Sequence, residues 1–285
     1  MDTRFLQSFV AVVEYGSIAE AGRRLNLTSA GVAQRVRALE AELETALVRR
    51  VGRRVHPTEA GRAVFERARE VLQGVRRLKD VATIDALAGE LRLGAVSTAM
   101  TGILPAIVSK ITIRHPNFSI YVVPGTSMDL YKRVVEGELD AAILVEPPFR
   151  ILKSCDWHLM RREPLMLIGS EAIDIEDPVR ILSSHPFIRY DRNHWGGRLG
   201  EEYLRDINVK PKDRFELDAL EAIAVMVDRG LGVSLVPDWA PPWPEGLRIA
   251  KKIISHSAYI RHIGLIWART SSRLRLIEAF LDQAR

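Results

Sequence analysis

The chain of 285 residues contains one cysteine, Cys155, and no run of about 18 uncharged apolar residues. A single cysteine excludes an intrachain disulfide and a cysteine-rich zinc site, and it favours a reducing compartment. The missing apolar run argues against a membrane-spanning helix, and the first residues lack the long apolar core of a signal peptide. We therefore expect a cytoplasmic protein with no membrane partner.

Catalytic signatures are missing as well. The sequence has no Gly-x-Ser-x-Gly elbow, Walker loop, His-Glu-x-x-His helix or complete Gly-x-Gly-x-x-Gly turn. Its seven histidines show no spacing typical of metal ligands. We therefore expect no enzymatic activity, no metal and no cofactor. A redox role for Cys155 is an alternative, which is disfavoured because the chain has no second cysteine to resolve an oxidised thiol.

Positive charge is concentrated near the N-terminus. The whole chain carries a net charge of +5, and the segment from Arg23 to Arg54 alone holds eight arginines and three glutamates. Arginine is the side chain best suited to bidentate contacts with phosphate and guanine. A solvated helical face would also explain a run of charge, but the local pattern favours a nucleic-acid surface.

The first sixty residues read as a winged helix-turn-helix. Apolar periodicity predicts helices near 3–14, 18–25 and 29–43, with a tight turn before the third. The third helix would enter the major groove, and the segment 47–58 would form two short strands around a Gly-Arg turn, the wing. We expect base contacts from Ser29, Gln34 and Arg35. The other candidates for DNA contact are Arg23, Arg37, Arg50, Arg53 and Arg54.

A long helix is predicted from Thr58 to about Leu87, because this segment contains no proline. Its apolar residues are spaced alternately four and three apart, which is typical of a coiled-coil seam. We expect the seam to pair two subunits, and a helix packed on its own domain is the alternative. The candidate dimerisation residues are Val64, Ala68, Val71, Val75 and Leu78.

From Glu90 onward, strands alternate with helices, which predicts an α/β region with a mainly parallel sheet. Strands are expected at 91–96, 118–123, 140–145, 165–169, 187–190, 233–236 and 263–268. Ligands of such sheets bind beyond the carboxyl ends of the strands. A solute-binding protein would fit this region but would leave the arginine-rich N-terminus unexplained, and an enzyme fused to a DNA-binding domain would need a catalytic constellation.

Three blocks of the N-terminal region, in order and correctly spaced, resemble the signature of LysR-type transcriptional regulators. They are Ser17–Thr28, Val36–Leu43 and Gly52–Gly61. Further blocks at 115–116, 137–140 and 230–237 extend the resemblance over nearly the whole chain. At the start of the third helix, Ser29 and Ala33 replace the Gln and Ser usual in the family, which removes groups that would donate and accept in the groove.

The resemblance implies a three-part organisation. It consists of a winged helix-turn-helix DNA-binding domain at 1–58, a dimerising linker helix at 59–88 and a two-lobed, periplasmic-binding-protein-like α/β effector domain at 89–285. Lobe I would comprise 89–162 and 267–285, and lobe II 163–266, with crossings near 161–164 and 266–269. The implied protein is a sequence-specific regulator of promoter DNA, a homodimer that assembles to a homotetramer, with RNA polymerase as a candidate partner.

The resemblance also implies an effector site in the cleft between the lobes. Hydroxyls, free amides and an arginine there suit a small organic anion. Plain helix capping is the alternative for Ser97 and Thr98, and a surface ion pair is the alternative for Arg189. Arg192 and His194 follow the last strand end as weaker candidates. The expected effector-binding residues are Ser97, Thr98, Gly125, Thr126, Ser127, Val145, Glu146, Arg189 and Tyr190.

Overall fold

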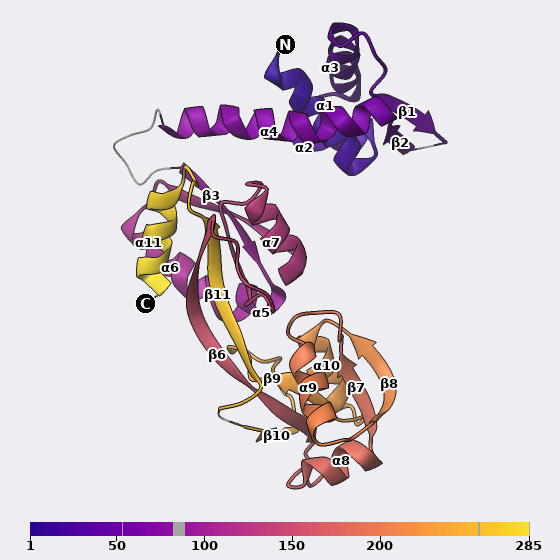
Figure 1. Ribbon diagram of the computed structural model, residues 1–285, viewed down its shortest axis with the longest axis vertical. Helices are drawn as coiled ribbons and strands as arrows, with labels where there is room; N and C mark the ends of the chain where they lie inside the picture. The colour runs from indigo at the N-terminus through magenta and orange to yellow at the C-terminus, as the bar shows by residue number, and fades with distance from the viewer. Residues whose placement is uncertain (53, 82–88, 256, 285) are drawn as a thin grey trace. The chain divides into compact units, whose positions relative to one another are not determined.

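The computed structural model describes residues 1–52, 54–81, 89–255 and 257–284 (Figure 1). The chain divides into two compact units, 1–84 and 85–285, each with its own core. Arg53 and residues 82–88 of the expected linker helix lie outside the described residues. Within the described ranges, every helix is too short or too polar to span a bilayer.

Three short helices and a two-stranded wing precede one long helix in the first unit. The elements are α1 (Thr3–Tyr15), α2 (Ile18–Leu25), α3 (Ser29–Glu42), β1 (Val48–Val51), β2 (Arg54–Pro57) and α4 (Glu59–Val81). At the start of α2 the Ser17 hydroxyl accepts from the Glu20 amide, and at the start of α3 Thr28 accepts from the Gly31 amide. Asn26 adopts a left-handed conformation (φ 54°) that ends α2. The predicted winged helix-turn-helix is confirmed.

The junction between the wing and α4 is fixed by one hydroxyl and one glycine. The Thr58 hydroxyl donates to the Ala46 carbonyl (2.7 Å) and accepts from the Gly61 amide (2.9 Å). A Cβ at Gly61 would lie 1.9 Å from the Leu47 carbonyl oxygen, which is far inside van der Waals contact. Glycine therefore lets α4 start directly against the backbone that enters the wing.

The first half of α4 completes the core of the first unit. Ala68 and Leu72 are buried in the cluster that contains Phe9 of α1, and Val64 packs against it. Val64 is half-buried, so its assignment to an intermolecular seam stays a prediction, whereas Ala68 lies in the core of its own domain. A side chain such as Ala68, with 2% of its surface exposed, is already covered by its own domain and has no surface left for a partner.

The later seam positions differ from these two. Val71 keeps 44% of its surface exposed. Val75 is half-buried, and the side chain of Leu78 lies outside the described residues. Within the part of α4 that the structure describes, Val71 is therefore the seam residue with the most surface available to another chain.

The first lobe of the second unit combines the N-terminal and C-terminal segments of that unit. Its elements are β3 (Gly89–Ala95), α5 (Ser97–Gly102), α6 (Leu104–Arg114), β4 (Phe118–Pro124), α7 (Ser127–Val135), β5 (Ala141–Val145), β11 (Ile260–Ala268) and α11 (Leu274–Ala284). The strands run in the order β11-β5-β3-β4, with β3 parallel to both neighbours and β11 antiparallel to β5. Leu93, Ile143 and Phe280 lie fully buried in one cluster, which joins the early strands to the C-terminal helix.

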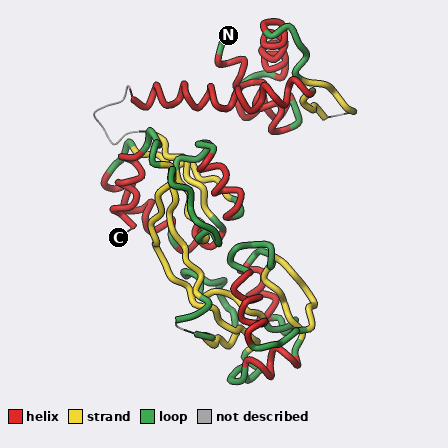
Figure 2. The backbone as a smooth tube through the Cα atoms, in the orientation of Figure 1, coloured by secondary structure: helices red, strands yellow, loops and turns green. Residues whose placement is uncertain are grey.

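The second lobe is inserted between β5 and β11. Its elements are β6 (Cys155–Ser170), α8 (Pro178–Ser184), β7 (Pro186–Tyr190), α9 (Arg198–Asp206), β8 (Lys212–Leu217), α10 (Leu220–Asp228), β9 (Ser234–Pro237) and β10 (Ile249–Ile253). The long strand β6 serves both lobes: 155–164 pair with β11, whereas 165–170 pair with β9 and β10. Figure 1 labels β6 and β11, and Figure 2 shows them in the same orientation as the long yellow strands that run between the two lobes.

The two-lobed α/β architecture is confirmed, with three corrections. The large sheet is mixed, because β6, β9, β10 and β11 pair antiparallel. The second crossing lies earlier than 266–269, because 263–267 already pair with β5 of the first lobe. The elements α8, β8 and β10 were not expected from the sequence. Nearly all side chains of β8 are exposed, so no apolar alternation marks this strand.

Candidate functional sites

The third helix, α3, has an apolar face toward the core and a polar face away from it. Its buried side chains are Val32, Val36 and Leu39. Of the four side chains expected to contact DNA from this helix, Ser29, Gln34 and Arg37 are exposed and Arg35 is half-buried. Three of these four side chains are therefore accessible to another molecule without any rearrangement of the core.

A hollow of about 450 Å³ opens beside the start of this helix. It is lined by Ser17, Ile18, Ala19, Ser29, Ala30, Ala33, Arg50 and Val55. The first residues of α2 and α3 and one arginine of the wing thus converge on one surface. The small side chains Ser29 and Ala33 leave this space open, at the positions where the sequence departs from the family pattern.

The arginines around this surface are not equally available. Arg23 makes a short ion pair with Glu20, which also accepts from Arg24 at 3.2 Å. Hydrogen bonding from Arg23 is the main cause that lowers the pKa of the Glu20 carboxyl. Although 74% of the Arg23 side chain is exposed, its charge is therefore partly compensated.

The wing carries its own arginines. Arg50 is exposed, and its Nε donates to the carbonyl of Gly52 at 3.2 Å, which holds the side chain along the hairpin. Arg54 is exposed on the second strand, whereas Arg53 lies outside the described residues. Arg50 and Arg54 therefore present their positive charge on the same hairpin that borders the hollow.

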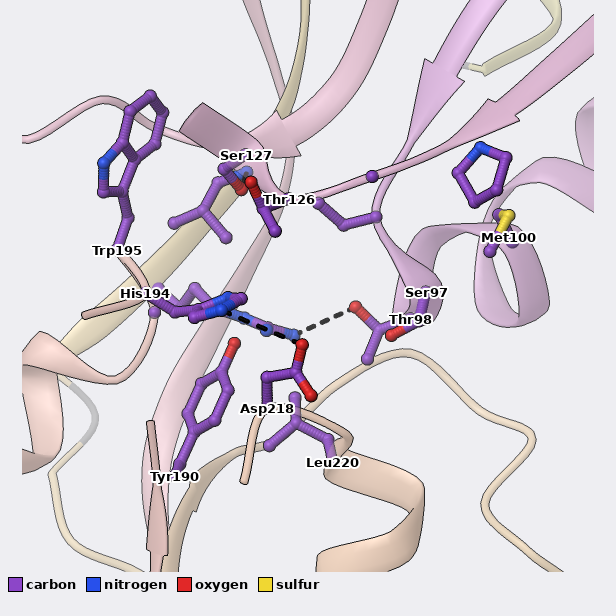
Figure 3. Close-up of a pocket in the computed structure, with 16 residues that line it drawn as sticks. Ser97, Thr98, Met100, Thr126, Ser127, Tyr190, His194, Trp195, Asp218 and Leu220 are labelled. Atoms are coloured by element: carbon purple, nitrogen blue, oxygen red, sulfur yellow. Dashed lines mark hydrogen bonds and ion pairs between the residues drawn. The ribbon is translucent and has the colours of Figure 1, made fainter. Parts of the chain in front are cut away.

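A second cavity, of about 250 Å³, is lined by both lobes of the second unit (Figure 3). From the first lobe it is lined by Val96, Ser97, Thr98, Met100, Pro124, Gly125, Thr126, Ser127 and Val145. These residues follow or end the strands β3, β4 and β5. A cavity thus lies where ligands of such sheets are expected to bind, beyond the carboxyl ends of the parallel strands.

Three hydroxyls of this wall already serve as acceptors. Ser127 Oγ accepts from the Val145 amide (3.1 Å), and Thr126 Oγ1 accepts from the Asp129 amide (3.2 Å). Thr98 Oγ1 accepts from a buried guanidinium at 3.3 Å. Among the described residues, none of the three hydroxyls has a protein acceptor for its own proton within hydrogen-bond distance. Each O–H is therefore free to donate into the cavity.

The guanidinium belongs to Arg261 of β11, which sequence reasoning missed. Its Nη2 lies 2.5 Å and its Nε 2.7 Å from Glu163 Oε2. Both side chains are almost completely buried, with 2% and 1% of their surface exposed. The positive charge of Arg261 is therefore already neutralised inside the protein, at the point where β6 and β11 pass between the lobes.

The second lobe supplies the opposite wall. Tyr190, His194, Trp195, Gly196, Asp218 and Leu220 line it. Burial is the main cause that raises the pKa of the Tyr190 phenol, so this group stays protonated at neutral pH. Figure 3 shows Tyr190, His194 and Asp218 pointing toward the first-lobe hydroxyls, with His194 Nε2 3.8 Å from the Asp218 carboxylate.

Trp195 connects the two walls. Its ring packs edge to face with Tyr131 of α7 (6.1 Å between centroids) and with Phe149 (5.5 Å), and it is buried in the first lobe's own core cluster. The loop that carries His194 and Gly196 is thereby held against the first lobe. One side of the cavity wall is thus anchored across the cleft by an aromatic cluster.

Seven of the nine expected effector residues line the cavity, and two do not. Arg189 points away from it, because neighbouring side chains on β7 face opposite sides of the strand. The Arg189 guanidinium instead pairs with Asp213 (2.7 Å) and with Glu201. Glu146 lies outside the cavity lining, and its Oε2 is 2.6 Å from Nδ1 of His262.

Two weaker sequence candidates are also resolved. His194 lines the cavity, whereas Arg192 pairs outward with Glu216 at 2.9 Å. Cys155 is buried at the start of β6, and burial raises the pKa of its thiol. Reactive cysteines have lowered pKa values and access to solvent, so neither property supports a redox role. In the ranges that the structure describes, no group of three or more metal-ligating side chains occurs.

Comparisons with known proteins agree with this anatomy. Residues 3–62 match the family model of the bacterial regulatory helix-turn-helix protein, lysR family, and residues 85–285 match the LysR substrate binding domain. The HTH-type transcriptional regulator CzcR of Bacillus subtilis (strain 168) is 32% identical over 244 residues, which cover 84% of this chain and 81% of CzcR.

Solved structures give the same fold over the whole chain. A full-length single-substitution variant of OxyR from Pseudomonas aeruginosa has a TM-score of 0.73 at 22% identity, and the match covers 100% of this chain and 95% of that one. Full-length CbnR complexed with its target DNA has a TM-score of 0.69 at 20% identity, with coverage of 100% and 99%. The chain therefore belongs to the LysR-type transcriptional regulators, DNA-binding proteins with an effector-binding domain rather than enzymes.

Proposed function

We propose that this regulator binds double-stranded promoter DNA as a homodimer that assembles to a homotetramer, and that a small organic anion in the cavity switches it. The cytoplasm is its place of action, and RNA polymerase is a candidate partner. The observation that carries the proposal is a cavity with one wall from each lobe. A ligand held by both walls favours one lobe arrangement over another, and only such a difference in affinity can shift the equilibrium.

The first-lobe wall supports an anionic ligand. Thr98, Thr126 and Ser127 each accept one hydrogen bond within the protein and keep the proton of the hydroxyl free. Such hydroxyls can donate their protons to what enters the cavity, so they match a carboxylate or another oxygen-rich acceptor. Thr98 and Ser127 are buried, which strengthens the donation because little water competes for it.

Calorimetry of the full-length protein against a panel of small metabolites tests the effector proposal. Compounds with a carboxylate or phosphate should bind, and Ser127→Ala should weaken them by about tenfold, the usual effect of one hydrogen bond to a charged group. Ser119→Ala, at a hydroxyl outside the cavity, is the matched control and should leave binding unchanged. Binding confined to compounds that lack an acidic group would refute the proposal.

For DNA, we propose that Ser29, Gln34 and Arg35 read bases, with Arg37 contacting DNA from the same helix. Arg23, Arg50, Arg53 and Arg54 would contact phosphate or the minor groove. The exposure of Gln34 and the hollow beside Ser29 support this division. The arginine-rich wing supports a large electrostatic share of the affinity.

Gel shifts on the DNA upstream of the gene, repeated over a range of salt concentrations, separate these roles. Arg54→Ala should weaken binding similarly on all sequences and reduce the salt slope by about one. Gln34→Ala should weaken only the operator, with the slope unchanged. Arg150→Ala removes an exposed charge from the second unit and serves as the control. No shift at low salt, with or without added metabolites, would count against the proposed operator.

The proposed dimer rests on α4, where Val71 is the exposed apolar residue of the described seam. Val71→Glu would place a charge in the paired seam, so the protein should become monomeric and lose affinity for a twofold operator. Ala63→Glu adds the same charge at an exposed position outside the seam and is the control. Size-exclusion chromatography with light scattering decides the matter: a Val71→Glu variant that stays dimeric or larger would contradict this seam.

A further inference from the structure

The cavity wall contributed by the second lobe carries a negative charge, whereas the first-lobe wall carries none. The ionisable side chains that line the cavity are Tyr190, His194, Asp218 and Arg261. Arg261 lines the cavity while paired with Glu163, whose other carboxylate oxygen lies 3.3 Å from Arg161 Nε, so positive charge is already present on that side of the cavity. The carboxylate of Asp218 lies on the opposite wall, and among the described residues it has no arginine or lysine within 4.0 Å.

Asp218 has few partners of its own. Within the described residues its carboxylate accepts no hydrogen bond, and its nearest ionic neighbour is His194 Nε2 at 3.8 Å. That imidazole is shared with Asp191, whose Oδ2 lies 3.7 Å from the same nitrogen. Asp218 follows directly after β8 and keeps 60% of its side chain exposed at the cavity. It therefore retains lone pairs that can accept from a donor inside the cavity.

The two walls of the cavity thus favour groups of opposite charge on one ligand. The first-lobe hydroxyls of Thr98, Thr126 and Ser127 offer protons, whereas Asp218 of the second lobe offers negative charge. A simple carboxylate would satisfy the first wall and would meet repulsion from Asp218 at the second. A simple amine would satisfy Asp218 and would leave the hydroxyl protons without an acceptor.

The size of the cavity limits the ligand further. A cavity of about 250 Å³ lies just below the roughly 300–1,000 Å³ of pockets for drug-sized molecules, so it suits a small ligand. Met100, Leu220 and Trp195 supply apolar surface between the polar groups, which suits a short hydrocarbon side chain.

We propose that the acid bound in this cavity also carries an ammonium group, as in a small zwitterion of the amino-acid type; this inference deepens and rests on the proposed effector function. Its carboxylate accepts from the first-lobe hydroxyls, and its ammonium donates to Asp218. Because each charged end is held by a different lobe, one such molecule bridges the cleft. A ligand that lacks either charged end binds only one lobe well. Its affinity then differs little between the possible lobe arrangements, so it shifts their equilibrium less.

The test is calorimetry of the full-length protein with the twenty standard L-amino acids, each paired with the carboxylic acid that lacks its amino group. We expect at least one amino acid to bind at least about tenfold more tightly than its deaminated partner, the effect of one charge-assisted hydrogen bond. Asp218→Asn should reduce this ratio to about one. Asp191→Asn removes the other carboxylate beside His194, outside the cavity lining, and should leave the ratio unchanged.

The outcomes separate this inference from the proposed function. If deaminated acids bind as tightly as amino acids, and Ser127→Ala weakens both, the zwitterion is wrong while an acid effector in this cavity stands. If ligands bind but neither Ser127→Ala nor Asp218→Asn changes their affinity, the site is elsewhere and both proposals fail. Amines that bind without a carboxylate, or the failure of every amino acid to bind, would overturn the zwitterion whatever the acids do.

Discussion

The ion pair between Glu163 and Arg261 offers a sharp test of the energetics at the lobe crossing. Both side chains are at most 2% exposed, and two nitrogens of Arg261 lie within 2.7 Å of Glu163 Oε2. Glu163→Leu would leave the guanidinium buried without a counter-charge. For pairs this deeply buried, removing one partner costs about 3–5 kcal/mol of the free energy of unfolding.

The reverse replacement should cost less, because Glu163 has further partners. Its Oε1 accepts from the Ala240 amide at 3.2 Å and lies 3.3 Å from Arg161 Nε. In Arg261→Met the remaining carboxylate therefore keeps one donor and one nearby cation. The double variant removes both charges of the pair but leaves the Ala240 amide without its acceptor, so it should cost about 1–3 kcal/mol, less than Glu163→Leu alone.

Tryptophan fluorescence during urea unfolding measures these differences in the full-length protein. All five tryptophans lie between Trp157 and Trp267, so the signal follows the second unit alone. The prediction is an order of cost, with Glu163→Leu above Arg261→Met and a coupling energy of at least about 2 kcal/mol between them. If the cost of the double variant equals the sum of the single variants within about 0.5 kcal/mol, the pair is not coupled and the reasoning is wrong.

Three further predictions concern other parts of the chain. Gly61→Ala should destabilise the first unit by at least about 1–3 kcal/mol, because the new Cβ would clash with a backbone carbonyl. Gly74→Ala on the same helix meets open space and should stabilise the first unit by about 0.5–1 kcal/mol. Hydrogen exchange of α1 amides measures both changes. Glu20→Gln should raise DNA affinity a few-fold at low salt by releasing Arg23, and an unchanged salt titration would exclude this compensation. Burial raises the pKa of the Cys155 thiol, so the native protein should react slowly with a disulfide reagent at pH 8. The reaction should become faster at higher pH, because the folded state loses stability as the pH rises from the unfolded pKa of the thiol to its raised folded pKa. Labelling at pH 8 as fast as in urea would contradict the burial.

The parts of the fold that could be predicted from the sequence are those set by local chemistry. A hydroxyl directly before an apolar helical repeat predicts a cap, and Ser17 and Thr28 both cap helices. The convergence of strand ends in a parallel sheet predicts Thr126 and Ser127 in the cleft, where both line the cavity. Neither inference needs knowledge of distant contacts.

The parts that could not be predicted depend on register and on long-range pairing. Arg189 was expected in the cleft and lies on the other face of its strand, the error that a one-residue shift produces. Arg261 meets Glu163 across 98 residues of sequence, in a strand whose apolar neighbours give no sign of a buried charge. Asp218 joins the cavity only because the exposed strand β8 pairs with β7, and β8 itself has no apolar pattern.

The position of β11 in the sheet has a consequence for the order in which the protein is made. This strand lies between β5 and β6 and pairs with both, yet the whole inserted second lobe precedes it in the chain. The first unit can fold as soon as α4 has emerged, whereas the sensor waits for residues beyond 260. If translation stopped before this point, the product would contain the DNA-binding domain and an incomplete effector-binding domain. The edges of β5 and β6 that pair with β11 would then be open to other chains.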